Sequence, residues 1–159
     1  MTRGTEAMRG GVTLDMRPYM CRVLAFNEVN QTITVEPGMM GPALEAHCNE
    51  AQTRHGASRA YTCGHFPQSF EYSSVGGWVV TRGAGKASTY YGKIEDMVLS
   101  MRMVTPRGTF STGPWPAAAI GPDMDQVLMG SEGAFGVCTA VTLRLHRYTP
   151  QTTRRFSYM

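Results

Sequence analysis

The sequence predicts an α+β domain with a mostly antiparallel sheet and a few helices. Short segments of alternating apolar and polar residues, typical of half-buried strands, occur in both halves of the chain. A few segments with helical spacing are interspersed among them, and this combination is typical of the α+β class. The chain has 159 residues, which suits one domain, or part of a larger one, and is enough to bury a core.

The N-terminal half begins with three predicted strands. They cover residues 12–16, 22–27 and 31–36. Residues 28–30 are the connection of a hairpin between the last two strands. Gly41-Pro42 then opens a predicted helix, because the missing N–H of proline is no loss at the first helical position. Gly56 is placed to end this helix.

The C-terminal half contains two longer alternating segments, residues 94–105 and 137–146. Their inward-facing side chains are expected to be Met97, Leu99, Met101 and Met103 in the first segment and Val137, Thr139, Val141, Leu143 and Leu145 in the second. A turn at residues 106–108 leads into a returning strand at residues 109–112. Pro122 begins a short helix, which Gly130 closes.

Composition and charge argue against several classes of protein. Fifteen Lys and Arg residues against 12 Asp and Glu give a net charge of +3, and the basic residues are scattered, so we predict no nucleic-acid surface. No apolar run approaches the roughly 18–20 residues of a membrane-spanning helix, and the first residues do not form a signal peptide. The four cysteines form no CxxC pair, so we expect free thiols and no metal site.

Glycine is the informative excess, with 18 residues. Two glycine-rich stretches, residues 68–85 and 130–136, carry hydroxyl or charged side chains. Glycine lets the backbone approach a ligand closely, and successive N–H groups bind anions. Composition alone leaves two interpretations open, a site for a diphosphate-bearing cofactor or tight turns in a sheet domain. Residues 83–86 are similar to the tail of a phosphate loop, but neither stretch is GxGxxG or GxxxxGK[ST], which disfavours a Rossmann domain or a nucleotide triphosphatase.

The order of residues in these stretches resembles a known family. The run SFEYSSVGGWVVTRGAG is followed by YYGKIEDMV, VTPRG, GPD and GSEGAFGV. This order resembles the FAD-binding (PCMH-type) domain of the vanillyl-alcohol-oxidase-type flavoproteins over roughly residues 10–148. Within them it is most similar to the alkylglycerone-phosphate synthase family, which typically reads TRASG and YGxIEDxV where this chain has TRGAG and YGKIEDMV. The resemblance implies the second of two α+β subdomains that hold FAD between them.

The resemblance also implies three FAD-contacting loops. The first loop consists of Gln68, Ser69, Phe70, Glu71, Tyr72, Ser73 and Ser74. The second loop consists of Thr81, Arg82, Gly83 and Ala84. The third loop consists of Glu132, Gly133, Ala134, Phe135, Gly136, Val137 and Cys138. Hydroxyls and amides suit the diphosphate and the edge of the flavin ring, and small residues let the flavin approach the chain.

Several of these residues depart from the family or allow a second interpretation. Gln68 stands where the family usually has Asp, Gly83-Ala84 where it often has Ala-Ser, and Ala134-Phe135 where it commonly has Thr-Leu. Arg82 is expected to pair with the diphosphate, and the alternative is an exposed or salt-bridged surface residue. Trp78 is expected to be a buried anchor rather than a flavin neighbour.

The activity implied by the resemblance is that of an FAD-dependent transferase of ether-lipid biosynthesis. Such an enzyme exchanges the acyl group of acyl-dihydroxyacetone phosphate for a fatty alcohol, with no net redox change. Two alternatives stay open. One is an FAD-linked oxidoreductase of the same fold that acts on a hydroxy acid or an alcohol, and the other is a truncated, non-catalytic fragment.

We expect the chain to be part of a larger enzyme. Residues 1–9 would hold a remnant of the family's pyrophosphate loop, residues 10–148 a partial FAD-binding domain, and residues 149–159 a linker toward a cap domain. The family's catalytic residues lie in that cap, so we assign no catalytic residue here and expect the fragment alone to be inactive. For the parent protein the family implies a peroxisome or a related organelle, and leaves peripheral membrane contact and a homodimer open.

Overall fold

A computed structural model of the chain describes residues 10–113, 115 and 119–149. The strands are β1 Val23–Asn27, β2 Thr32–Val35, β3 Tyr61–Thr62, β4 Val98–Thr105, β5 Gly108–Ser111, β6 Val137–Arg144 and β7 His146–Arg147. The helices are α1 Gly41–Asn49, α2 Ala51–His55, α3 Val75–Val80, α4 Ser88–Tyr91, α5 Ile94–Met97 and α6 Met124–Leu128. The mostly antiparallel sheet with few helices confirms the predicted α+β class. The proposed pyrophosphate-loop remnant and nearly all of the predicted linker lie outside the described residues.

Five strands form the main sheet in the order β1-β2-β6-β4-β5, and every neighbouring pair is antiparallel. The predicted hairpin between β1 and β2 is present, and so is the returning strand β5 beside β4. Strands β6 and β4 form the centre of the sheet, where Met101 lies opposite Val141 and both side chains are buried. Strands β3 and β7 form a separate two-stranded sheet.

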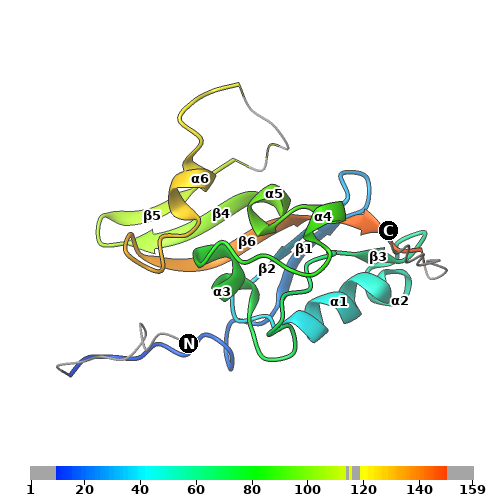
Figure 1. Ribbon diagram of the computed structural model, residues 1–159, viewed down its shortest axis with the longest axis horizontal. Helices are drawn as coiled ribbons and strands as arrows, with labels where there is room; N and C mark the ends of the chain where they lie inside the picture. The colour runs from blue at the N-terminus through cyan, green and yellow to red at the C-terminus, as the bar shows by residue number, and fades with distance from the viewer. Residues whose placement is uncertain (1–9, 114, 116–118, 150–159) are drawn as a thin grey trace, which may run out of the picture.

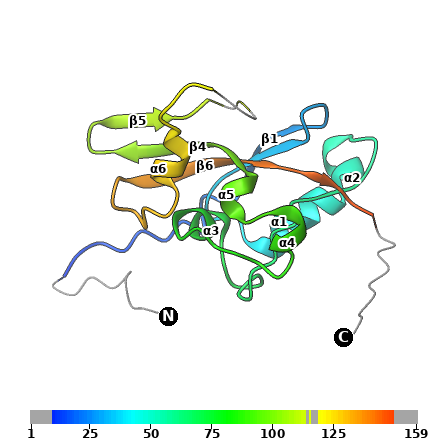
Figure 2. The same cartoon turned by 45° about the horizontal axis from the view of Figure 1, so that its top comes forward.

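Helices cover both faces of the main sheet. Helix α3 packs against β6, and α6 packs against β4. In Figure 1 α6 lies above the β4–β5 end of the sheet, whereas α1, α2 and α3 lie below it. Figure 2, in which the top of the molecule comes forward, shows α6 in front of β4 and α3 near the β6 strand. Because both faces are covered, neighbouring residues of β4 such as Val98 and Leu99 are both buried.

Helix α1 begins where the sequence predicts. Pro42 lies in its first turn, and α2 continues the helical segment to His55. Gly56 follows at φ +68, a left-handed conformation that glycine adopts without a steric penalty, so it ends the helix as expected. None of the helices among the described residues combines the length and apolar character needed to cross a membrane.

Three details of the sequence-based prediction are wrong. Residues 12–16 form no strand, and the side chains of Val12 and Leu14 are 94% and 64% exposed, because no neighbouring strand among the described residues pairs with them. Residues 94–97 form helix α5 rather than the start of β4. Val137 and Thr139 are not the inward-facing residues at the start of β6: the Val137 side chain is 39% exposed and Thr139 is half-buried, whereas Cys138 and Ala140 are buried.

Candidate functional site

Helix α3 connects the first loop to the second loop. Ser74 begins the helix, and its hydroxyl accepts a hydrogen bond from the backbone N–H of Gly77 at 3.4 Å. Thr81 ends it and donates its hydroxyl proton to the carbonyl of Gly77 at 2.7 Å. Local side-chain bonds at both ends of α3 therefore define where the first loop ends and where the second loop begins.

The first loop is a compact turn that is fixed at its C-terminal end. The backbone N–H of Tyr72 and the hydroxyl of Ser73 both donate to the carbonyl of Ser69, at 2.9 and 2.8 Å. The Ser73 hydroxyl in turn accepts the indole N–H of Trp78 at 2.7 Å. The Ser73 carbonyl accepts the N–H of Gly41, which joins the loop to the start of α1. Tyr72 is left 83% exposed at the tip.

Trp78 is the buried anchor that the sequence predicts, with 3% of its surface exposed. Its ring lies against His65 at a centroid distance of 4.8 Å, edge to face, and is stacked with Phe70 at 6.2 Å. Phe70 also contacts Phe66 at 5.3 Å. This aromatic cluster packs Phe70 of the first loop against the buried Trp78.

The first and second loops line the same cavity, which has a volume of about 770 Å³. Its lining residues are Phe66, Pro67, Gln68, Phe70, Glu71, Tyr72, Ala84, Gly85 and Lys86. A Cβ atom at Gly85 would lie 2.7 Å from the carbonyl carbon of Phe66, and Lys86 N–H donates to the Phe66 carbonyl at 3.0 Å. Only glycine allows these two backbone segments to approach so closely, and together they form one wall of the cavity.

The cavity combines aromatic walls with one positive and one negative side chain. Phe66 and Phe70 supply apolar surface, while Lys86 and Glu71 are exposed at its edge. A lysine ammonium is a common phosphate ligand, and aromatic surface suits a planar ring. Gln68, which replaces the family's usual Asp, adds an uncharged amide at the edge.

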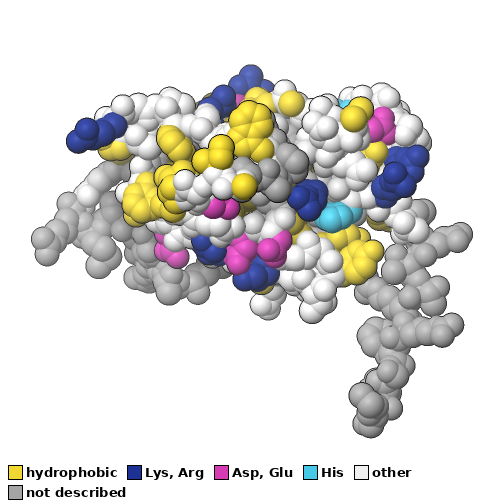
Figure 3. All heavy atoms as spheres, turned by 90° about the horizontal axis from the view of Figure 1, so that it is seen from above, with side chains coloured by type: hydrophobic (Ala, Val, Ile, Leu, Met, Phe, Trp, Pro, Cys, Tyr) yellow, Lys and Arg dark blue, Asp and Glu magenta, His cyan; other side chains and the backbone are white. Residues whose placement is uncertain are grey.

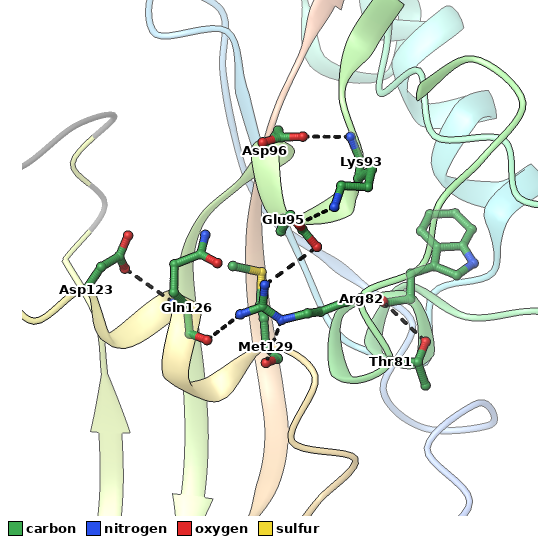
Figure 4. Close-up of polar contacts among 9 residues, drawn as sticks. Thr81, Arg82, Lys93, Glu95, Asp96, Asp123, Gln126 and Met129 are labelled. Atoms are coloured by element: carbon green, nitrogen blue, oxygen red, sulfur yellow. Dashed lines mark hydrogen bonds and ion pairs between the residues drawn. The ribbon is translucent and has the colours of Figure 1, made fainter. Parts of the chain in front are cut away.

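The second loop turns sharply at Arg82, whose φ is +52. Its guanidinium does not line the cavity as far as the described residues define it. Instead Nη2 donates to the carbonyl of Gln126 at 2.5 Å and Nε to the carbonyl of Met129 at 3.2 Å, and Nη1 lies 3.7 Å from Glu95 Oε2 (Figure 4). The structure therefore places the Arg82 charge between α5 and α6.

The third loop lies against the C-terminal end of α3 rather than in the cavity lining. The N–H of Glu132 donates to the carbonyl of Val80 at 3.0 Å. Glu132 and Gly133 have φ values of +48 and +87, so the loop turns tightly as the glycine-rich pattern predicts. Phe135 is 50% exposed.

Cys138 lies at the start of β6 and is a small core residue, as expected. Its side chain is 7% exposed, and burial raises the pKa of its thiol to about 11. The thiol is therefore protonated at neutral pH, and this position offers a ligand its backbone rather than a thiolate.

Sequence reasoning missed His65, which lies behind the cavity. It is 1% exposed, and neither ring nitrogen has a hydrogen-bond partner among the described residues. Burial lowers its pKa to about 4, so the ring is neutral at pH 7. A Cβ at Gly83 would lie 3.6 Å from Nε2, an ordinary van der Waals contact, so Gly83 lies directly beside the imidazole.

Four residues of the cavity lining lie outside the three predicted loops: Phe66, Pro67, Gly85 and Lys86. They directly flank the two predicted loops, so their position beside a matched motif was the available signal. Taken together, the aromatic walls, the backbone contact that needs glycine and the lysine at the edge fit a ligand with a planar ring and a phosphate group. The residues present therefore fit part of an FAD molecule.

A second cavity of about 390 Å³ lies between β4, β5 and the segment leading into α6. Hydrophobic side chains gather over α6 and β5 on the face shown in Figure 3, and Phe110, Trp115 and Ile120 line the cavity. Its carboxylates already have partners, since Asp125 accepts from Thr112 and Asp123 caps α6. Across the described ranges, no three His, Cys, Asp or Glu side chains are grouped so as to bind a metal ion.

Comparisons with known proteins support the assignment of a flavin site. The model of a family described as "FAD binding domain" matches residues 2–113. An alkyldihydroxyacetonephosphate synthase of Trypanosoma brucei brucei is 38% identical over 142 residues, which cover 89% of this chain and 22% of that protein. A mitochondrial cytochrome-type D-lactate dehydrogenase of Arabidopsis thaliana is 34% identical over 146 residues, covering 90% of this chain and 24% of that protein.

The fold of this chain is also similar to that of a solved synthase structure. A solved structure of an alkyldihydroxyacetonephosphate synthase superposes with a TM-score of 0.73 at 35% identity, over 84% of this chain and 22% of that one. The resemblance to this synthase family expected from the motifs is therefore confirmed. The chain spans about a fifth of the length of the synthases it matches.

Proposed function

Because this chain belongs to the FAD binding domain family, we propose that the cavity between its first and second loops receives part of an FAD molecule. The observation that carries the proposal is that two loops chosen for this role from sequence motifs line one cavity, although their lining residues Gln68 and Ala84 lie at opposite ends of a segment that includes α3. The third loop completes the arrangement, since it is bonded to the end of the same helix.

Each part of the cavity has a role in this proposal. Phe66 and Phe70 provide a surface for a planar ring, and the Trp78 cluster holds Phe70 in place. Lys86 attracts the diphosphate. FAD supplies the isoalloxazine ring that carries the reaction, and the protein binds, orients and polarises it.

For the whole protein we propose the reaction of the synthases it resembles. The relative from Trypanosoma brucei brucei and the solved structure are named alkyldihydroxyacetonephosphate synthase, which supports an exchange of the acyl group of acyl-dihydroxyacetone phosphate for a fatty alcohol in ether-lipid synthesis. Acyl-dihydroxyacetone phosphate and a fatty alcohol are then its substrates, and a peroxisome or a related organelle is its proposed location. This chain would contribute the flavin site and no catalytic side chain.

A second function has its own support. The D-lactate dehydrogenase matches 90% of this chain and the synthase 89%, at 34% and 38% identity. An FAD-linked oxidoreductase acting on a hydroxy acid is therefore the alternative. The two functions share the cofactor and differ in whether the substrate reduces it.

The flavin site is tested by titrating the purified chain with FAD. We compare the wild type with Ala84→Trp, which places a large ring in the cavity, and with Ala25→Trp, which places the same ring on the exposed edge strand β1. Ala84→Trp is expected to weaken FAD binding by about tenfold or more, because filling a binding cavity removes the contacts of the ligand.

Ala25→Trp is the control for the general effect of an added indole and is expected to bind FAD like the wild type. Equal affinity of the Ala84→Trp variant and the wild type would contradict the proposed site. The reaction itself is tested on the full-length protein, with acyl-dihydroxyacetone phosphate and a fatty alcohol in one assay and D-lactate in another. Reduction of bound flavin by D-lactate, without ether formation, would replace the synthase proposal with the oxidoreductase.

A further inference from the structure

The side chain of Arg82 connects three segments that are distant in sequence. It starts from the second loop and donates to the carbonyls of Gln126 and Met129, which lie in α6 and directly after it. Its ion-pair partner Glu95 lies in α5 and also contacts Lys93 at 2.5 Å. Figure 4 shows the guanidinium between these groups. Hydrogen bonds from a charged donor are among the stronger ones in proteins.

The backbone is shaped to allow this contact. Arg82 has a φ of +52, which is uncommon for a residue with a side chain. Gly130 lies opposite, and a Cβ there would be 2.9 Å from Arg82 Cδ. Gly130 itself has a φ of +75, so a larger residue would be strained at this position as well as crowded. The close approach of Arg82 and Gly130 therefore depends on the positive φ of Arg82 and on a glycine at position 130.

The same contact determines where the third loop begins. Gly130 N–H donates to the carbonyl of Val79 at 3.2 Å, and Glu132 N–H donates to the carbonyl of Val80 at 3.0 Å. Arg82 binds the carbonyl of Met129, the residue directly before these two bonds. The start of the third loop is thus attached to the end of α3 by two backbone bonds and to the second loop by one side-chain bond.

We propose that Arg82 is a positioning residue that holds the third loop against the second loop, and that it does not pair with the FAD diphosphate. The proposal rests on the proposed function only in that the loops it joins would bind FAD. Its guanidinium is bound by the carbonyls of Gln126 and Met129 and lies beside Glu95, whereas Lys86 lines the cavity. Arg82 would then affect FAD binding through the geometry of the loops.

The test compares Arg82→Met and Arg82→Lys with the wild type. Arg107→Met is the matched control, because Arg107 is an exposed arginine in the β4–β5 turn. The first measurement is amide hydrogen exchange in the FAD-free protein, followed at Gly130 and Glu132. The second is FAD affinity at low and at high salt.

In the FAD-free protein, Arg82→Met is expected to speed exchange at Gly130 and Glu132 by about tenfold, since the bonds of the charged donor are lost. Arg82→Lys should give an intermediate rate, because an ammonium group can reach one carbonyl, and Arg107→Met should match the wild type. FAD affinity of Arg82→Met should fall by a factor that is the same at both salt concentrations, as expected for lost geometry rather than lost charge.

Unchanged exchange at both amides in Arg82→Met would overturn the proposal. An affinity loss that disappears at high salt, with unchanged exchange, would instead make Arg82 a ligand of the diphosphate. If Arg82→Met fails to fold, Arg82→Lys decides by the same exchange measurement. If the wild type binds no FAD, the proposed function fails, whereas the exchange rates still decide whether Arg82 holds the loop.

Discussion

His65 shows at the residue scale how burial controls charge beside the proposed site. Its ring lies edge to face against Trp78 and next to Gly83, with neither nitrogen bonded among the described residues. A buried polar group without a partner costs about 1–3 kcal/mol, and a charged one costs more. The lowered pKa of about 4 follows from this cost, because the cationic form would lie in an apolar setting.

The stability of the chain should therefore depend on His65 below pH 6.5. The unfolded chain takes up a proton near pH 6.5 and the folded chain only near pH 4, so His65 lowers the free energy of unfolding as the pH falls between these values. At pH 4.5 this contribution is about 2 to 3 kcal/mol. Urea unfolding of the wild type and of His65→Gln at pH 7 and pH 4.5 measures it, and a loss between the two pH values that is equal in both proteins would show that His65 is not involved.

The binding partners of Arg82 could not be predicted from its residue type. An arginine inside a motif of a flavoprotein predicts a partner with negative charge, and the sequence offers the diphosphate for this role. The structure gives it the carbonyls of Gln126 and Met129, which are 44 and 47 residues away. Carbonyl partners at such separations leave no pattern in the sequence, because every residue carries the same group.

At the element scale, a buried carboxylate holds α1 against β3. Glu45 is 7% exposed and accepts hydrogen bonds from the Thr62 hydroxyl at 2.8 Å and from the backbone N–H groups of Cys63 and Gly64 at 2.8 and 3.2 Å. Burial raises its pKa, and the three hydrogen bonds act in the opposite direction. This contact positions the strand that leads directly into His65 and the cavity wall.

Glu45→Ala should destabilise the chain by about 2–4 kcal/mol, because it leaves the buried N–H of Cys63 without an acceptor, the buried N–H of Gly64 with the Thr62 hydroxyl alone, and the Thr62 hydroxyl without its own acceptor. Glu50→Ala on the same helical segment is the control. Glu50 forms an exposed pair with Arg54, so its loss should cost about 1 kcal/mol or less. Urea midpoints compare the two, and a similar small loss in both variants would contradict a structural role for Glu45.

Strands and turns were predictable where a neighbour completes the pattern. The β1–β2 hairpin, β5 and the helix ending at Gly56 follow from alternation and glycine alone. Residues 12–16 alternate in the same way but form no strand. Alternation of apolar and polar residues indicates two different faces, but it does not show whether a neighbouring strand is present to pair with the segment. The sequence does carry a helical signal for α5: Ile94 and Met97 are apolar and three residues apart, and both are buried in the structure. Asp96 is a further signal, since its carboxylate accepts the Lys93 N–H and caps the helix.

At the scale of the whole molecule, three loops converge on one short helix. The first loop leads into α3, the second follows it, and the third is bonded to its last residues. The central strands β4 and β6 support this arrangement, because α3 packs on β6 and the third loop leads directly into β6. The sequence motifs identify the loops, and the fold accounts for how segments as distant in sequence as residues 68–74 and 132–138 come together.

The central claim is that these three loops form one FAD site, and hydrogen exchange with and without saturating FAD tests it most directly. We expect slower exchange in residues 66–72, 83–86 and 130–136 when FAD is bound, because these segments line the cavity or are bonded to the helix beside it. Protection confined to residues 110–126, around the second cavity, or absent from the whole chain despite FAD binding, would contradict it.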